Sequence, residues 1–503
     1  MKRIIFLLII FLFPNFLTAQ AIIEWSQNYG GNESDILQSL EKTNDGGFLL
    51  VGTSYYSLEN DGVYDCLVIK TDSLGNIEWS QNYGGGLNES GVSVVTTNDE
   101  GFLIAGVQSD EYDSNSGDYW LLKIDSLGNI EWNQTYGGNK WDELKGLNQT
   151  IDGGFILVGY SASDNGDLSD NNGSTDFWVL KIDSIGNIEW SQNYGGNCID
   201  EATSVTKTND GGFLVGGWSC SDDGDVGTNN GTDDYWVLKI DGLGNIDWSR
   251  NYGGSGSERL ETVISTNDGG FLLGGGSNSV DGDINSNNGD LDFWVLKIDG
   301  LGNIEWSQNY GGSELEYIEE LIETSDGGFL LGGMSNSNDG DVSANNGNND
   351  YWIVKINELG TIEWEQNYGG SNDEQLYSLL EISEGYFLLG GYSNSNDGDV
   401  VNSNDLDFWV IKINEMLLST EIKMIALSND FSFYPNPTTG KFTINNESKT
   451  IQTIIVHDIM GKLIHEQRTN VTQINVNIDV ESGIYLLSLE TKEGMFYKKI
   501  IIQ

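Results

Sequence analysis

Seven near-copies of one segment occupy most of this chain and constrain its fold more than any other feature. The phrase Ile-Glu-Trp-Ser-Gln-Asn-Tyr-Gly-Gly begins at Ile23 and recurs with small changes. Its tryptophan falls at Trp25, Trp79, Trp132, Trp190, Trp248, Trp306 and Trp364, so successive copies lie 53 to 58 residues apart. Such a period, built from short strands, is typical of radial or stacked repeat folds, because no single unit buries its apolar face alone.

Each copy is expected to contain four strands. In the copy at residues 255–310 the expected strands are 259–265, 271–275, 292–298 and 304–310. Turns of Asn, Asp and Gly separate the first two strands and the last two, and these residues supply the positive φ angles of tight hairpins. A longer polar loop joins the second strand to the third. Four antiparallel strands of this kind make one blade of a β-propeller.

The two ends of the repeat region complement each other. Residues 21–29 read as a fourth strand without strands one to three, and residues 407–414 read as a third strand without a fourth. If they pair, neither leaves an open edge, which favours a closed ring over an open β-solenoid or a string of small β domains. We therefore expect an all-β, seven-bladed propeller over residues 21–414. Its blades are expected at about 32–83, 86–136, 139–194, 197–252, 255–310, 313–368, and 371–414 plus 22–29.

Residues 1–19 are expected to be a signal peptide. Lys2 and Arg3 precede an apolar run at 4–13, and small residues follow around Ala19. The run is too short to span a bilayer, which needs about 20 residues. We therefore expect a secreted protein without a transmembrane segment.

The cysteines give no sign of a covalent framework. Cys66, Cys198 and Cys220 are odd in number and show no C-x-x-C spacing. The sequence therefore predicts neither a disulfide framework nor a thiolate metal site.

The C-terminal segment 431–503 differs from the repeats in charge. It carries seven basic and seven acidic residues, whereas the whole chain has a formal net charge of −54. A domain boundary is therefore expected in the linker 415–430.

Four ordered motifs in this segment resemble the type A C-terminal sorting domain of type IX secretion cargo. They are Tyr434-Pro435-Asn436-Pro437-Thr438, residues 456–462 (Val-His-Asp-Ile-Met-Gly-Lys), residues 482–486 (Ser-Gly-Ile-Tyr-Leu) and residues 498–502 (Lys-Lys-Ile-Ile-Ile). The resemblance implies an immunoglobulin-like β-sandwich, recognition by the type IX machinery of a Gram-negative bacterium, and release or attachment at the outer cell surface. The sorting-signal residues it implies are Tyr434, Pro435, Asn436, Pro437, Gly461, Gly483, Tyr485, Lys498 and Lys499. His457 stands where that family usually has an aromatic residue.

The repeats carry a second resemblance. Tyr-Gly-Gly followed by acidic residues, then Asp-Gly-Gly-Phe-Leu-Leu-x-Gly-Gly, is similar to SBBP-type β-propeller repeats of secreted bacterial proteins. This likeness covers residues 21–414. It implies a fold and an extracellular setting but no reaction.

Five long loops between second and third strands carry the pattern Ser-x-Ser-x-Asp/Asn-Gly-Asp. They share one side of the ring with the blade connections, so a concentrated negative face is expected there. The connection acids include Asp200, Glu201, Glu258, Glu314, Glu316, Asp373 and Glu374.

Carboxylate and Asn oxygens spaced by glycine in these loops suggest calcium, which takes six to eight oxygen ligands. The candidate ligands are Asp167, Asp223, Asp225, Asp281, Asp283, Asp339, Asp341, Asp397 and Asp399. The favoured alternative is that these residues form Asx-turns and keep the loops solvated. Charge of this size disfavours nucleic acid and anionic lipid as partners.

One position near the end of the second strand varies from blade to blade. It reads Thr53, Val107, Tyr160, Trp218, Gly276, Met334 and Tyr392. Tyr160, Trp218 and Tyr392 are candidates to stack on a sugar ring or a partner side chain, although packing under the loop is the favoured interpretation. The tryptophan of the fourth strand, present in every blade, is expected to pack between blades.

The residue inventory argues against most enzyme classes. Histidine occurs only at His457 and His465, so the repeats lack imidazole for a catalytic triad, a general base or zinc binding. The residues that break the repeat are Lys140, Trp141, Lys145, Trp218, Arg250 and Arg259, and their scatter suggests no constellation. We therefore expect no catalytic residues and, calcium aside, no cofactor. The predicted function is a non-enzymatic binding, adhesion or scaffold module that meets the type IX machinery and an unknown glycan or protein ligand. The alternative is an extracellular polysaccharide hydrolase with a carboxylate pair.

Overall fold

The chain divides into two compact units, Met1–Leu418 and Ser419–Gln503. The computed structural model describes residues 20–31, 34–55, 64–110, 116–168, 171–400, 406–416, 431–446, 450–458, 463–478, 480, 483–491 and 494–502. The expected signal peptide and most of the expected linker lie outside the described residues. Within the described ranges no helix is long and apolar enough to cross a membrane.

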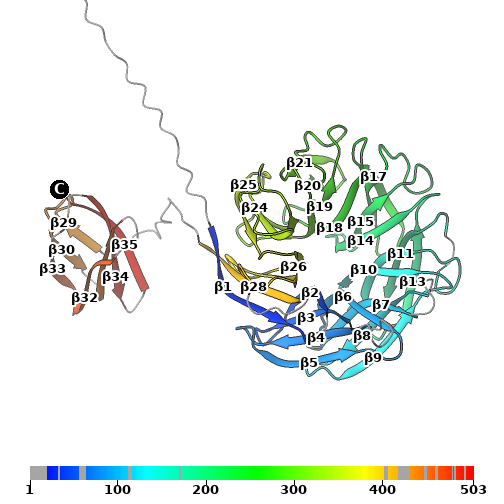
Figure 1. The fold of residues 1–503 in the computed structure, drawn as a ribbon, viewed down its shortest axis with the longest axis horizontal. Helices are drawn as coiled ribbons and strands as arrows, with labels where there is room; N and C mark the ends of the chain where they lie inside the picture. Colours follow the sequence, from blue (N-terminus) through cyan, green and yellow to red (C-terminus); the bar gives the residue numbers. More distant parts are fainter. Residues whose placement is uncertain are drawn as a thin grey trace, which may run out of the picture. The chain divides into compact units, whose positions relative to one another are not determined.

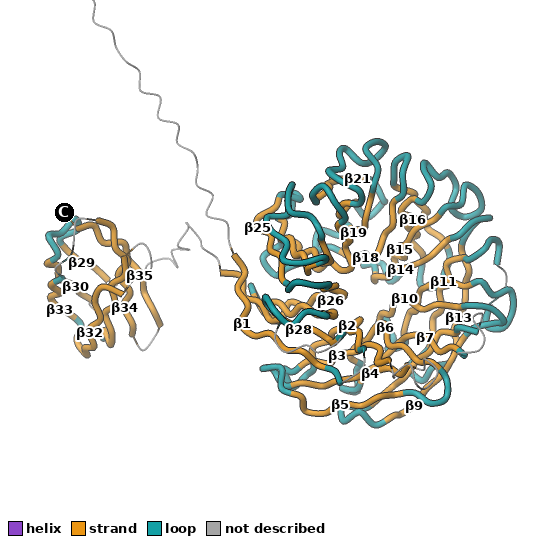
Figure 2. The backbone as a smooth tube through the Cα atoms, viewed as in Figure 1, coloured by secondary structure: helices purple, strands orange, loops and turns teal. Residues whose placement is uncertain are grey.

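The first unit is built from β-strands (Figures 1 and 2). They are β1 (Gln20–Tyr29), β2 (Asp35–Lys42), β3 (Phe48–Tyr55), β4 (Tyr64–Thr71), β5 (Ile77–Tyr83), β6 (Asn88–Thr96), β7 (Phe102–Ser109), β8 (Asp118–Ile124), β9 (Ile130–Tyr136), β10 (Asp142–Gln149), β11 (Phe155–Ser161), β12 (Asp176–Ile182), β13 (Ile188–Tyr194), β14 (Asp200–Lys207), β15 (Phe213–Ser219), β16 (Asp234–Ile240), β17 (Ile246–Tyr252), β18 (Glu258–Ser265), β19 (Phe271–Ser277), β20 (Asp292–Ile298), β21 (Ile304–Tyr310), β22 (Glu316–Glu323), β23 (Phe329–Ser335), β24 (Asp350–Ile356), β25 (Ile362–Tyr368), β26 (Glu374–Ser383), β27 (Tyr386–Ser393) and β28 (Asp407–Met416).

These strands pair in groups of four. Six sheets take consecutive strands, from β2–β5 to β22–β25, and one further sheet has the order β1-β28-β27-β26. All pairings within them are antiparallel, as the hairpin turns predict. The expectation of an all-β unit made of repeated four-stranded, propeller-like sheets is confirmed.

The sheets follow one another around a ring, and the N-terminal strand lies in the last of them (Figure 1). β1 pairs with β28 over nine residue pairs, from Gln20 opposite Met416 to Tyr29 opposite Phe408. Leu37 and Leu40 of β2 also pack in one apolar cluster with Leu388 of β27. The first and last sheets in chain order are therefore neighbours.

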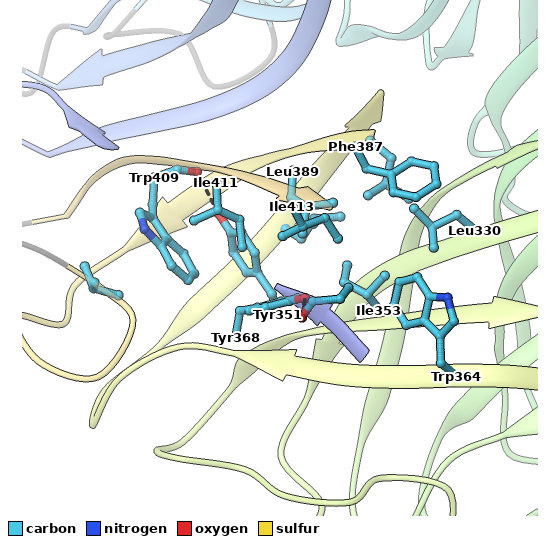
Figure 3. Packing of buried hydrophobic residues seen from close by; sticks show 14 residues of the cluster. Leu330, Tyr351, Ile353, Trp364, Tyr368, Phe387, Leu389, Trp409, Ile411 and Ile413 are labelled. Carbon is cyan, nitrogen blue, oxygen red and sulfur yellow. Dashed lines mark hydrogen bonds between the residues drawn. The ribbon is translucent and has the colours of Figure 1, made fainter. Parts of the chain in front are cut away.

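Apolar side chains fill the space between neighbouring sheets. Among the described residues, five third strands carry a fully buried tryptophan whose ring packs against an aromatic residue of the preceding sheet, as Trp236 does with Phe177 at 4.3 Å between ring centroids. Trp190 of a fourth strand packs on the same cluster and donates its Nε1–H to the carbonyl of Gly242 in the next sheet. Figure 3 shows one such cluster around Trp409 and Trp364. The predicted packing role of the fourth-strand tryptophans is confirmed.

In six sheets of the described chain, a buried lysine of the third strand links the first hairpin turn to the fourth strand. In the third sheet, Lys181 Nζ lies 2.7 Å from Asp152 in the first hairpin turn and also pairs with Glu189 of the fourth strand. The lysine stem is buried and its two acids stay largely in solvent. Lys70, Lys123, Lys239, Lys297 and Lys355 make the equivalent contacts.

One sequence prediction about the first unit is wrong, because Cys198 and Cys220 form a disulfide. Cys198 lies in the connection before β14 and Cys220 directly follows β15. Asp200 is opposite Ser219 in this hairpin, so the two cysteines lie just beyond the same residue pair. Spacing along the chain gives no hint of this, whereas the hairpin register does.

The second unit is a smaller all-β fold. Its strands are β29 (Phe431–Tyr434), β30 (Lys441–Asn446), β31 (Ile451–Asp458), β32 (Leu463–Val471), β33 (Gln473–Asn477), β34 (Gly483–Thr491) and β35 (Gly494–Ile502). They form two sheets, β29-β30-β33 and β32-β31-β34-β35. Both sheets contribute to one core, with Phe442 and Ile444 from the first and Ile454 and Leu487 from the second.

Candidate functional site

The five acidic loops are fastened to the connections between sheets. After β19, Ser255 N–H donates to Asp281 Oδ1 over 2.7 Å, and Gly253 N–H donates to Asp283 Oδ2 over 3.2 Å. Asp283 N–H returns a bond to the Gly253 carbonyl. The equivalent first acids are Asp223, Asp339 and Asp397, and the equivalent second acids are Asp167, Asp225, Asp341 and Asp399. Loops and connections therefore share one side of each blade.

Calcium binding by these nine aspartates stays a prediction. Across the described ranges, no group of three or more His, Cys, Asp and Glu side chains is arranged to hold a metal ion. The loop carboxylates accept backbone N–H bonds instead, as Asx-type turns require.

A pair of carboxyl groups, at least one of them buried, lies at each junction between neighbouring sheets. Asp176 opens β12, Asp200 opens β14, and both are fully buried. Both flank Gly195, where an added Cβ would lie 2.6 Å from Asp176 Oδ1 and 2.7 Å from Asp200 Oδ2. Burial, reinforced by the charge of Asp200, raises the pKa of Asp176 to about 6. The equivalent pairs are Asp407 with Asp35, Asp65 with Glu89, Asp118 with Asp142, Asp234 with Glu258, Asp292 with Glu316 and Asp350 with Glu374.

Four acids expected on an exposed negative face are therefore inside the fold. They are Asp200, Glu258, Glu316 and Glu374. Glu316, for example, accepts from Gly312 N–H and from Ser335 Oγ, each over 2.7 Å. Their assignment to an exposed face is wrong, because donors of the connection and of the first hairpin enclose them.

The first strand of every sheet carries a β-bulge whose extra residue lines the centre of the ring. In β18, for example, the register with β19 shifts between Leu260 and Thr262, which makes Glu261 the extra residue. The seven bulged residues are Gln38, Val92, Lys145, Thr203, Glu261, Glu319 and Tyr377, and all seven line one cavity of about 430 Å³. We call these seven residues the channel site. β-Bulges re-aim a side chain and are frequent beside functional sites.

The residue two places before each bulge varies in the same way. These neighbours are Ile36, Ser90, Glu143, Glu201, Arg259, Tyr317 and Gln375. Each lies opposite the variable position of the second strand, as Glu143 does with Tyr160 and Glu201 with Trp218. The two variable positions noticed in different strands therefore form one surface.

Glu143 and Lys145 form a tightly bound pair in the third sheet. Lys145 Nζ lies 2.6 Å from Glu143 Oε1. Glu143 Oε2 accepts from Trp141 Nε1 over 2.8 Å and from the Tyr160 hydroxyl. Burial opposes the charged form of Glu143, but Lys145 and these donors outweigh it and hold its pKa below the ordinary value. This carboxylate is fixed and ionised.

The next two sheets place an arginine over a tryptophan. The Arg259 guanidinium lies 4.5 Å from the Trp218 ring centroid and 3.4 Å from Asp233. Glu201 is near both Arg259 and Lys145, yet burial outweighs their charges and raises its pKa to about 7. The pKa values of Glu143 and Glu201 are thus displaced in opposite directions, although the two residues occupy equivalent positions in neighbouring sheets.

A chain of hydrogen bonds continues across the fifth to seventh sheets. The Tyr317 hydroxyl donates to Glu261 Oε1, and Gln375 Nε2 donates to Glu319 Oε1 over 2.7 Å. The Tyr392 hydroxyl donates to Gln375 Oε1 over 3.2 Å. Burial raises the pKa of Glu261 and of Glu319, and the charge of Glu261 raises the pKa of Glu319 further.

The residues that break the repeat are not scattered in space. Trp141, Lys145, Trp218 and Arg259 gather around the channel site through the contacts above. Lys140 pairs with Asp164, and Arg250 of β17 lies 5.9 Å from the Trp248 ring centroid. The conclusion that they form no constellation is therefore wrong for four of the six. Alignment of the first strands by their bulges is the signal that finds them.

The three predicted ligand-face aromatics lie beside the channel site. Trp218 is 8% exposed under Arg259, and Tyr160 and Tyr392 are half-buried with their hydroxyls bound. These contacts give all three a packing role. Contact with a ligand stays a prediction.

In the second unit, the predicted sorting residues fall on both sheets and their edges. Tyr434 is 54% exposed at the end of β29, next to Pro435 and Pro437. Asn436 Oδ1 accepts from Ile501 N–H over 2.9 Å, and Tyr485 joins the core. Gly483 opens β34, Lys498 and Lys499 belong to β35, and Gly461 lies outside the described residues.

Residues 432–503 match the family described as "Secretion system C-terminal sorting domain". The second unit is a type IX secretion sorting domain. The sorting domain indicates secretion to the cell surface, as its motifs predict.

A curated relative and several solved structures are similar to the chain. An ulvan lyase, NLR42 of Nonlabens ulvanivorans, is 27% identical over 205 residues, which are 39% of this chain and 34% of that protein. PorZ, a surface component of the type IX secretion system of Porphyromonas gingivalis, has a TM-score of 0.42 at 10% identity, over 92% of this chain and 59% of that chain. YCF48 bound to a D1 peptide has a TM-score of 0.42 at 11% identity, over 79% and 95%. The chain thus spans about a third of the ulvan lyase and under two thirds of PorZ.

Proposed function

We propose that this chain is an exported surface module whose first unit is a closed seven-bladed propeller that binds an extracellular ligand at the channel site. The sorting domain accounts for export. The seven sheets and the pairing of β1 with β28 support the closed propeller.

One observation carries it. The second, third and fourth strands are near-copies from blade to blade. The bulged residue of the first strand, in contrast, takes six identities across the seven sheets, with glutamate occurring twice. A residue that only packs a blade needs the same side chain in each blade. Different side chains aimed into one cavity support a single asymmetric site instead.

Ligand screening of the purified protein tests this proposal. The labelled protein is applied to arrays of glycans and of peptides, next to a variant with Lys145→Ala, Glu261→Ala and Glu319→Ala. Glu384→Gln, an exposed acid in the turn between β26 and β27, is the control for lost charge. We expect at least one ligand class to bind the wild type and the control but not the triple variant. Equal binding by all three proteins contradicts the proposal.

A second candidate function is polysaccharide cleavage. Glu143 and Glu201 have pKa values displaced in opposite directions, the arrangement by which a carboxylate pair divides base and acid roles. The partial similarity to an ulvan lyase points to the same class of substrate. Incubation with ulvan and with neutral polysaccharides tests this. An unsaturated product would indicate a lyase, and new reducing ends without unsaturation a hydrolase. Either activity should be lost in Glu201→Gln and kept in Glu384→Gln.

A further inference from the structure

We propose that the channel site takes its ligand through a protonated primary amine seated between Glu261 and Glu319. This inference rests on the proposed function and names the chemistry of the ligand. Glu261 and Glu319 are the bulged residues of β18 and β22, the first strands of neighbouring sheets, and both line the central cavity.

Each of the two carboxylates is held by one donor and keeps acceptor capacity for another. Tyr317 fixes Glu261 through Oε1, and Gln375 fixes Glu319 through Oε1. Within the described part of the chain, neither Oε2 atom has a hydrogen-bond donor. A carboxylate offers about four lone-pair positions, so most of the acceptor capacity of this pair is unused. An ammonium group carries three N–H donors and no acceptor, which suits two such oxygens.

The charge around the cavity favours a cation. Glu320 adds a third carboxyl group to the wall, and burial raises its pKa to about 7. Among the described residues that line the wall, Lys145 is the cation, and its Nζ is paired with Glu143 at 2.6 Å. The charge of Lys145 also acts on Glu261 and Glu319, and that of Arg259 acts on Glu261, yet burial outweighs them and raises the pKa of both carboxyl groups. Because Glu261 and Glu319 are half-buried and repel each other, a positive group between them stabilises both ionised forms. The net charge of −54 also attracts cations and repels anionic polymers.

The cavity selects an amine on a larger body rather than a bare ion. Its volume of about 430 Å³ far exceeds one ammonium group. Val92, Leu147, Val205 and the ring of Tyr377 line it and offer apolar surface to a carbon chain or a sugar ring. A lysine side chain, a polyamine and an amino sugar all provide this chemistry, and the test separates them.

Isothermal titration of the purified protein at low ionic strength and pH 8 provides the test. The probes are spermidine, a lysine-rich peptide and a glucosamine oligomer, each beside its N-acetylated form. We expect at least one amine to bind and its acetylated form not to bind. Hydrogen bonds to charged groups contribute about 1.5–3 kcal/mol, so the Glu261→Gln, Glu319→Gln variant should bind at least about 10-fold more weakly. The Glu384→Gln control should bind like the wild type. The probe with the highest affinity identifies the source of the amine.

Several results would overturn the inference. If the Glu384→Gln control loses as much affinity as the double variant, or if the double variant binds as tightly as the wild type, the amine is attracted to the acidic protein in general and not to this pair. Absence of binding by every amine also refutes it. If array ligands without an amine still depend on Lys145, Glu261 and Glu319, this inference fails and the proposed function stands. If no array ligand depends on those residues either, both fail.

Discussion

Ring closure by the N-terminal strand can be tested through one serine. Ser26 of β1 accepts a hydrogen bond from Trp409 Nε1 over 2.9 Å and donates to the Asp399 carbonyl over 3.0 Å. Ser249 makes the same two bonds inside another sheet, to Trp236 Nε1 over 2.9 Å and to the Asp225 carbonyl over 2.8 Å. Both tryptophans are fully buried. The two serines therefore make the same hydrogen bonds in different chain contexts. The strand of Ser249, β17, follows its partner strand β16 through a short hairpin, whereas β1, the strand of Ser26, is far along the chain from its partner β28.

We expect Ser26→Ala and Ser249→Ala to destabilise the protein equally. Each substitution leaves a buried indole N–H without its acceptor, which costs about 1–3 kcal/mol of the free energy of unfolding. Urea denaturation followed by tryptophan fluorescence measures the midpoint, and an unchanged slope shows that the unfolded states are alike. If β1 were detached in solution, Ser26→Ala would behave like the wild type while Ser249→Ala lost stability. That result would refute closure of the ring.

The junction aspartates have pKa values of about 6 to about 7 in the folded protein and of about 4 in the unfolded chain. Between these pH values the folded protein therefore binds more protons than the unfolded chain. The free energy of unfolding should then fall as the pH rises from about 4 to about 7. Melting curves across this range should show that fall, and Asp292→Asn should flatten it; a midpoint that rises with pH would contradict the assignment. Lys181→Met should cost only about 1 kcal/mol because its acids are largely exposed, and NMR titration should show the pKa of Asp152 rising from about 2 toward its ordinary value. Paired Cys198→Ser and Cys220→Ser substitutions should lower the free energy of unfolding by about 3 kcal/mol, since the disulfide closes a loop over a sequence separation of 22 residues; equal stability of reduced and oxidised protein would argue against the bond. Millimolar calcium added after chelator treatment should raise the melting midpoint if the acidic loops bind the ion, and an unchanged midpoint would remove that hypothesis.

Local patterns made the blades predictable. Strand lengths, hairpin turns and the order of strands all follow from the repeated phrase, because turn chemistry and β-propensity act over a few residues. The pairing of β1 with β28 was predictable because each of the two strands lacks a neighbour in its own copy of the repeat. The sorting domain was equally predictable, since each of its motifs is a short run of consecutive residues.

The channel site was less predictable for a physical reason. Lys145, Glu261 and Glu319 lie in different repeats, and each looks like an ordinary departure from the pattern. Their meeting depends on the bulge in every first strand, which turns these residues into one cavity. The prediction for the acids of the blade connections was wrong for a related reason, because a count of charges cannot distinguish a solvated carboxylate from one enclosed by donors, as Glu316 is.

The sequence by itself determined the repeat, its four strands, the export tag and the excess of acids, because each is written in neighbouring residues. Only the tertiary structure decided which of those acids are buried between blades, which cysteines meet, and which seven side chains face one cavity. Burial and convergence arise where distant segments pack together, and no stretch of this chain contains that information alone.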